Sequence, residues 1–157
     1  MTTPHVVAAR PVPSIVNRLN PLVRWLLGLG LPMGPNVLMT VRGRKSGKPY
    51  TFPVATLGVD GREYLFSPFG EVQWVRNLRA SGEATIRRGR RDHRMRAVEL
   101  APEDAAPFLR AGLEPIMGMP LFGSMIAGWY EVDRSSTPED YLASARRHPA
   151  FALIEIG

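Results

Sequence analysis

In several runs between residues 37 and 100, apolar positions alternate with polar ones, and this period of two is typical of half-buried strands. Five such runs are predicted, over residues 37–42, 49–58, 62–67, 83–88 and 91–100. Asp60-Gly61 is a strong two-residue hairpin signal, because a type I′ turn needs positive φ at both central positions. Gly89 marks a second turn. The middle of the chain is therefore predicted to form antiparallel hairpins.

The pattern changes to a helical period after the third strand. A helix is predicted over residues 71–80, ended by Ser81 and Gly82. With 3.6 residues per turn, Val72, Val75 and Leu78 form one apolar stripe, which we expect to be buried. This short helix is therefore expected to lie against the sheet.

In the last third of the chain, some segments predict a helix or a strand and one long segment predicts neither. A helix is predicted to begin at Pro102, and another spans 138–147 with Thr137 as its N-cap. Residues 112–134 carry no clear period, so no element is predicted there. Residues 150–156 predict a final strand.

The N-terminal region has a different character. Residues 1–13 predict a loose arm, and residues 14–29 predict an amphipathic helix, or two short ones divided at Asn20. Such a helix either covers the core or lies against a membrane or a partner, with Trp25 as an interfacial aromatic.

Turn-forming residues are abundant, with 15 Gly and 15 Pro in 157 residues. Short strands and one inserted helix predict a small, mainly β barrel of the α+β class, decorated by peripheral helices. We divide the chain into an N-terminal arm and helix, residues 1–35, and a barrel domain, residues 36–157.

The charge is strongly basic, with a formal net charge of +6 and a pI of about 10.5. Such a balance suits an anionic partner, although genomic base composition also enriches arginine. The absence of cysteine excludes disulfides and thiolate metal sites. The N-terminus lacks the features of a signal peptide, so we expect a cytoplasmic location, with membrane association through residues 14–29 as a further interpretation.

The densest candidate for chemistry is the run Gly43-Arg44-Lys45-Ser46-Gly47. Its glycines allow the backbone amides to turn toward an anion, and its side chains donate to phosphate oxygens. The same residue types are also common in plain hairpin turns. The run alone leaves both interpretations open.

Trp74 and Asn77 share one face of the helix predicted over 71–80. They either fill the edge of the core or stack on and hydrogen-bond a planar heterocycle. The arginine-rich stretch 87–96 reads as a solvated hairpin or, with less support, a nucleic-acid surface, since no nucleic-acid-binding motif accompanies it. The three histidines have no metal-ligand spacing, so no metal site is expected.

Three segments together resemble the deazaflavin-dependent nitroreductase family, which are actinobacterial split β-barrel proteins that bind coenzyme F420. They are "GRKSGKPYTFPV", "GREYLFSPFG" and "QWVRNLRASGEATIRRGRR". The resemblance covers roughly residues 36–100 and implies a split β-barrel and an F420-dependent oxidoreductase.

The resemblance also implies the coenzyme contacts. The phosphate and the acidic tail would be held by the basic turn: Arg44, Lys45, Ser46 and Gly47. The deazaflavin ring would be bordered and wrapped by Thr51, Pro53, Ser67, Pro68, Phe69 and Gly70. Trp74 and Asn77 would pack against the ring and anchor it.

The implied reaction is hydride transfer from reduced deazaflavin to an enone, a quinone or a nitro compound, with a proton from solvent or from Tyr50 or Tyr130. Trp129 and Tyr130 are predicted pocket residues. Tyr50 stands where the family usually has a second Arg, and Pro68 where relatives often carry Lys. These departures leave open a non-catalytic barrel that binds a lipid, a fatty acid, FMN or FAD. We expect a small-molecule substrate, no nucleic acid, and a monomer or homodimer.

Overall fold

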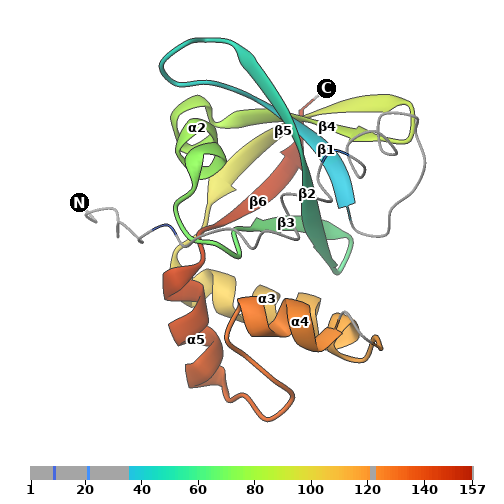
Figure 1. Ribbon diagram of the computed structural model, residues 1–157, viewed down its shortest axis with the longest axis vertical. Coiled ribbons are helices and arrows are strands. Elements are labelled where there is room, and N and C mark those ends of the chain that lie inside the picture. The colour runs from blue at the N-terminus through green and yellow to red at the C-terminus, as the bar shows by residue number, and fades with distance from the viewer. Residues whose placement is uncertain (1–8, 10–20, 22–35, 121–122, 157) are drawn as a thin grey trace.

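Six antiparallel strands close into a barrel in the order β1-β2-β3-β6-β5-β4, with β4 paired back to β1 (Figure 1). They are β1 (Asn36–Arg42), β2 (Pro49–Val59), β3 (Arg62–Phe66), β4 (Glu83–Arg88), β5 (Arg91–Glu99) and β6 (Ala150–Glu155). The computed structural model describes residues 9, 21, 36–120 and 123–156. The predicted split β-barrel is confirmed. Apart from positions 9 and 21, the predicted arm and helix of residues 1–29 lie outside the described residues.

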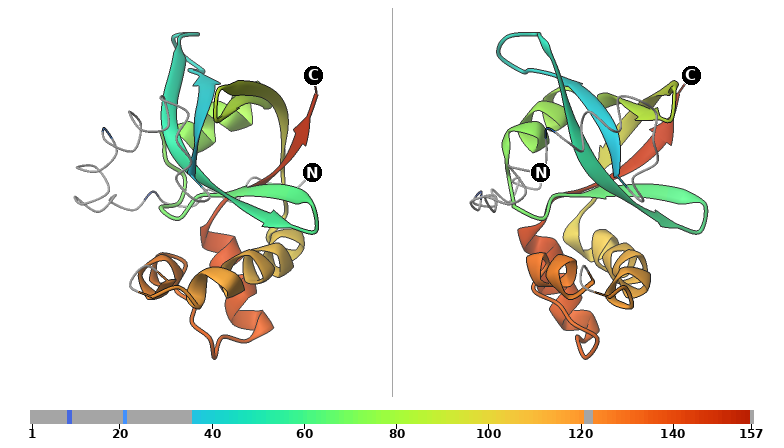
Figure 2. Two further views of the ribbon diagram at one scale, coloured as in Figure 1. Left: turned by 90° about the vertical axis from the view of Figure 1, so that its right-hand side faces the viewer. Right: turned by 45° about the vertical axis from the view of Figure 1, so that its right-hand side comes forward.

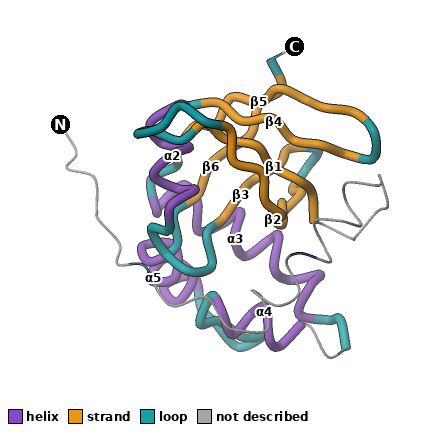
Figure 3. The backbone as a smooth tube through the Cα atoms, turned by 45° about the horizontal axis from the view of Figure 1, so that its top comes forward, coloured by secondary structure: helices purple, strands orange, loops and turns teal. Residues whose placement is uncertain are grey.

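The helices of the described residues occupy two places around the barrel. Helix α2 (Gln73–Ser81) packs against the barrel near the β1–β2 hairpin. The other three form a layer beneath it: α3 (Pro102–Met117), α4 (Gly123–Trp129) and α5 (Pro138–Arg147) (Figures 2 and 3). None of the helices in the described part of the chain is long and apolar enough to cross a bilayer.

Alternation along the strands builds two cores from the same sheet. On β3, Leu65 points into the barrel, whereas Tyr64 and Phe66 face the helical layer. On β6, Phe151 fills the barrel interior and Ala150 faces the helices. Each fully buried large side chain stabilises the fold by about 1.5–3 kcal/mol, so both faces of these strands contribute.

Helix α2 begins two residues later than the sequence predicts. Gly70 has a φ of 80°, and Val72 is the extended N-cap residue, so the chain turns before the helix starts. The end is as expected: Gly82 has a φ of 70°, and its N–H donates to the carbonyl of Leu78 at 2.8 Å. Val75 and Leu78 are fully buried in the barrel core, which confirms the predicted stripe.

The stretch without a predicted element is largely helical. Helix α3 continues through Pro107 and Pro115 to Met117, and α4 follows. Its buried face explains why it persists despite two prolines: Ala105, Leu109 and Leu113 lie in the same core cluster as Leu57 of β2. Tertiary contact with the sheet thus outweighs the local proline signal.

Local signals elsewhere are confirmed. Asp60 and Gly61 have φ of 51° and 76°, as a type I′ hairpin requires. Thr137 and Asp140 form a complete capping box at the start of α5. Both features are set by residues close together in sequence, which is why they could be predicted.

Candidate functional site

The turn between β1 and β2 is held tightly from within. The N–H of Gly43 donates to the carbonyl of Lys48 at 2.8 Å, and the N–H of Gly47 donates to the carbonyl of Gly43 at 2.9 Å. Gly47 has a φ of 70°, which favours glycine. A Cβ on Gly43 would lie 2.6 Å from the Tyr50 ring and 2.8 Å from Oγ of Ser46. Both glycines are therefore needed for this geometry.

Helix α2 fastens this basic turn to the barrel through Arg44. The backbone N–H of Arg44 donates to Oδ1 of Asn77 at 3.2 Å, and its Nη1 donates to the same oxygen at 2.7 Å. Nη1 also donates to Oε1 of Gln73 at 3.0 Å. Asn77 is buried, whereas Gln73 is exposed. The basic turn and the helix that carries Trp74, both named by the resemblance, are therefore in direct contact.

Gln73 was not predicted as a site residue. It lies four residues before Asn77, so both amides project from the same face of the helix. Helical spacing would have identified it once Asn77 was singled out.

Trp74 contacts aromatic rings of the barrel. Its ring lies 6.2 Å from Phe52 on β2 and 6.4 Å from Phe151 on β6, measured between centroids. Trp74 is half-buried, so part of its surface stays accessible. Trp74 therefore fills the edge of the core, as one of the two interpretations predicts. The exposed part of its ring is still available to stack on a ligand.

The strand β2 presents its predicted residues on two faces. Tyr50 and Phe52 project to the same side as Trp74, because side chains two apart share a face. Thr51 and Pro53 project to the outer side, where Oγ1 of Thr51 lies 2.7 Å from Oγ1 of Thr40. The structure thus does not bring Thr51 and Pro53 to the face that Trp74 occupies.

The loop after β3 is internally braced. Oγ of Ser67 donates to the carbonyl of Gly70 at 2.5 Å, and its backbone N–H donates to the carbonyl of Pro149 at 2.9 Å. Ser67 is fully buried, whereas Pro68 and Phe69 are half-buried. In this loop, Ser67 shapes the turn, and Pro68 and Phe69 present the accessible surface.

Trp129, a predicted pocket residue, contacts this loop through Phe69. The Phe69 ring lies 5.4 Å from that of Trp129 on α4. The helical layer therefore supports the loop, although α4 lies far from it in sequence.

The two predicted proton donors differ in accessibility. Tyr50 is 49% exposed, and its hydroxyl lies 3.3 Å from Oγ of Ser46. Tyr130 is buried, with its ring edge-on to Phe66 and His148. Burial raises the pKa of Tyr130 above its ordinary value, so its hydroxyl stays protonated. Of the two, Tyr50 can reach a bound molecule without rearrangement; both catalytic roles stay predictions.

The electrostatics of the basic turn favour an anion. Lys45 and Lys48 are exposed, and their ammonium groups have no partner among the described residues. The start of α2 carries no acidic residue in its first turn and no side-chain cap. Its unpaired backbone N–H groups add partial positive charge beside the turn. Carboxylate or phosphate groups would therefore find both ammonium donors and backbone dipoles here.

Three of the six arginines in the hairpin of β4 and β5 pair with acids in the described structure. These ion pairs join Arg87 to Asp92, Arg88 to Glu63 and Arg94 to Glu83, and Nδ1 of His93 lies 2.8 Å from Oε1 of Glu155. These pairs neutralise part of the positive charge of the hairpin, which favours a solvated hairpin at the paired positions. No cluster of three or more metal-ligating side chains occurs within the described ranges.

Two neighbouring cavities lie away from these residues, between α3 and α5. Their volumes are about 460 Å³ and 220 Å³, and they share the side chains of Arg110, Glu114 and Tyr141. None of the predicted site residues lines either cavity.

Comparison with known proteins gives a family and a fold. The profile of the F420H(2)-dependent quinone reductase family matches residues 20–115. No curated protein sequence matches the chain significantly.

Three of the solved structures that are similar to this chain illustrate the likeness. An F420-H2 dependent reductase is 20% identical, covers 76% of this chain and 94% of its own, and has a TM-score of 0.48. A domain-swapped dimer is 17% identical over 91% and 100% of the two chains, with a TM-score of 0.55. A Listeria innocua protein named after pyridoxamine 5'-phosphate oxidase is 10% identical over 88% and 94%, with a TM-score of 0.50. At these identities the last two indicate the fold alone.

Proposed function

This chain belongs to the family of F420H(2)-dependent quinone reductases, and from that premise we propose that the basic turn and the start of α2 form its coenzyme-binding surface. The chain is accordingly an F420-dependent reductase, with coenzyme F420 as its cofactor. The proposal concerns which residues perform each part of this activity.

The observation that carries the proposal is the junction of Arg44 with Asn77. It brings the basic turn and the Trp74 helix together, although the hydrogen bonds join residues 33 apart in sequence. The donor set fits the acidic part of F420: two exposed ammonium groups, the Ser46 hydroxyl and the uncapped start of a helix.

The two lysines and Arg44 have different roles in this proposal. Arg44 already donates to Asn77 and Gln73, so it holds the turn in place. Lys45 and Lys48 are exposed and are therefore the groups that bind the anionic tail. Tyr50, in place of a further cation, contributes a hydroxyl beside Ser46.

The planar part of the coenzyme would lie between Trp74 and the half-buried surface of Pro68 and Phe69. When bound, reduced F420 supplies a hydride to an electron-poor acceptor, which we propose to be a quinone, an enone or a nitro compound. The aromatic side chains orient the reactants and exclude water. Tyr50 is the proposed proton donor, with solvent as the alternative source.

Thr51 and Pro53, on the outer face of β2, have a supporting part in this proposal: they hold the strand that presents Tyr50 and Phe52. The substrate pocket would extend toward Trp129. Its aromatic contact with Phe69 supports this direction.

We also propose that the protein acts in the cytoplasm as a monomer or a homodimer, with residues 14–29 in peripheral contact with a membrane. A similar solved structure is a domain-swapped dimer. Light scattering of the purified protein measures the oligomeric state, and cosedimentation with anionic vesicles tests the membrane contact.

Titration with oxidised F420, beside FMN and FAD, tests the proposed coenzyme surface. We expect the coenzyme's fluorescence to change on binding, and F420 to bind more tightly than either flavin. Reduced F420 should then be consumed when menadione is added. Absence of F420 binding at high micromolar protein would contradict the proposal, and binding without turnover would support a non-catalytic barrel.

A further inference from the structure

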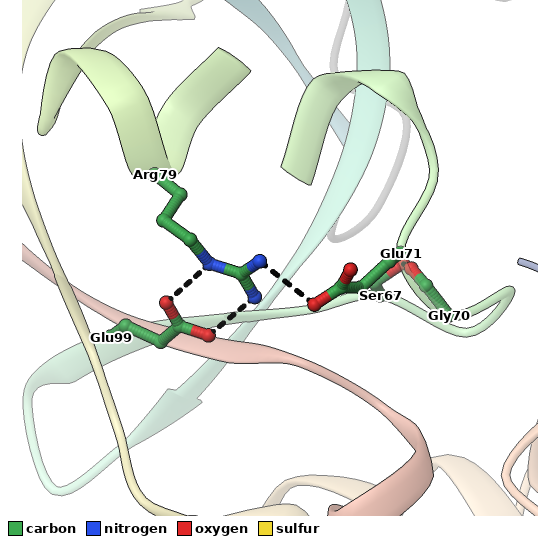
Figure 4. A network of polar contacts seen from close by, with 5 residues as sticks. All are labelled: Ser67, Gly70, Glu71, Arg79 and Glu99. Carbon is green, nitrogen blue, oxygen red and sulfur yellow. Dashed lines mark hydrogen bonds and ion pairs between the residues drawn. The ribbon is translucent and has the colours of Figure 1, made fainter. Parts of the chain in front are cut away.

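Arg79 joins three segments that meet beside the candidate site. It lies near the end of α2, and its Nη1 donates to Oε1 of Glu71 at 2.7 Å. Its Nε and Nη2 donate to the two carboxylate oxygens of Glu99, each at 2.7 Å. Figure 4 shows the guanidinium between the two carboxylates, one from the loop before α2 and one from the end of β5. One side chain thus ties helix, loop and strand together.

The two acids of this network differ in burial. Glu71 is 3% exposed and Glu99 is 37% exposed. The hydrogen bond to Glu99, and then the one to Glu71, raise the pKa of Arg79 despite its partial burial, so it stays charged. A buried carboxylate left without a partner keeps its full desolvation penalty. The charge of Arg79 therefore offsets the cost of burying the Glu71 carboxylate. The two hydrogen bonds to Glu99 fix the plane of the guanidinium.

Glu71 directly follows the loop that is braced by Ser67. The carbonyl of Gly70 accepts from Oγ of Ser67 at 2.5 Å and from the N–H of Val72 at 2.9 Å. Ser67 and Gly70 are drawn with the network in Figure 4. Fixing Glu71 consequently fixes the end of the turn that presents Pro68 and Phe69.

We propose that Arg79 is a positioning residue for coenzyme binding, which acts through Glu71 on the loop of residues 67–70. Asn77 fastens the basic turn to α2, and Arg79 fastens this loop to the same helix. One short helix thereby sets the separation between the part of the site that binds the acidic tail and the part that faces the ring. This inference rests on the proposed function and deepens it.

Three variants separate positioning from stability. Arg79→Met leaves the buried Glu71 without its cation and should lower both the melting temperature and the affinity for F420. The double variant Glu71→Gln/Arg79→Met removes both charges, so it should regain much of the melting temperature. Arg87→Met, which breaks the exposed pair with Asp92 on the distant hairpin, is the matched control.

The measurements are F420 affinity by fluorescence titration and amide hydrogen exchange at residues 69–72. We expect Arg79→Met and the double variant to bind F420 roughly tenfold more weakly, or about 1.4 kcal/mol, with faster exchange at these amides. Arg87→Met should match the wild type in both. If Arg79→Met does not fold, the double variant supplies the result.

Wild-type affinity and exchange in the double variant would overturn the inference and leave Arg79 a purely stabilising residue. Absence of F420 binding by the wild type would overturn the proposed function, and this inference with it. The two failures are distinguished by the wild-type titration alone.

Discussion

The guanidinium and the backbone amide of Arg44 both donate to the side-chain oxygen of Asn77, which lies 33 residues later in the chain. This contact fixes the position of a basic turn relative to a helix that carries an aromatic residue. The turn is thereby anchored to the helix, and its two exposed lysines project from that anchored turn.

Asn77→Ala should destabilise the protein by about 1–2 kcal/mol, because a buried acceptor is lost and the Arg44 donors lose their partner. The affinity for F420 should fall as well, since the turn is no longer held. Chemical denaturation and fluorescence titration measure the two effects.

Asn77→Asp separates the effect of charge from the effect of stability. It keeps the acceptor for Arg44, so stability should be largely retained, but its negative charge should still weaken the binding of an acidic coenzyme. Equal affinities in the wild type and Asn77→Asp would contradict the placement of the acidic tail here.

Lys45→Ala should weaken F420 binding roughly tenfold, or about 1.4 kcal/mol, while the melting temperature changes by less than about 2 °C. Lys45 is exposed and has no partner among the described residues, so its loss costs the fold little. The difference in affinity should shrink at high salt because the interaction is screened. Parallel losses of stability and affinity would instead identify Lys45 as part of a structural turn.

Gly112→Ala should destabilise the fold by about 1–3 kcal/mol through overpacking. A Cβ there would lie 2.8 Å and 2.9 Å from Cδ1 and Cβ of Leu57, and that side chain is itself buried. Gly128→Ala is the matched control: no atom lies within 4 Å of its Cβ position, so a gain of up to about 1 kcal/mol is expected in a helix. Thermal unfolding of the two variants should therefore shift in opposite directions.

Tyr130→Phe should reduce the loss of stability at alkaline pH. Burial raises the pKa of Tyr130 above its ordinary value of 10.0, so the unfolded chain loses this proton at a lower pH than the folded one. The stabilisation is therefore present below about pH 10 and is lost as the pH rises further. Denaturation midpoints between about pH 9 and pH 11 should fall less for Tyr130→Phe than for the wild type; equal slopes would show that Tyr130 is accessible in the folded state.

Some parts of the candidate site could be predicted from sequence, and others could not. The glycines of the basic turn and the apolar stripe of Val75 and Leu78 follow from local periodicity and turn chemistry. The contact of Phe69 with Trp129 does not, because it depends on how α4 packs under the barrel. The roles of Gln73, Glu71 and Arg79 were missed because charged and amide side chains on a short helix usually face solvent.

The sequence by itself determined the strands, the turns at Asp60-Gly61 and Gly89, the capping box at Thr137 and the basic turn. Each of these depends on interactions between neighbouring residues. Only the tertiary structure decided that β6 lies between β3 and β5 to close the barrel, that α3 continues past its prolines, and that α2 holds both Arg44 and Glu71. Those outcomes depend on contacts between residues far apart in sequence, which bury apolar surface and pair buried polar groups only once the chain has folded.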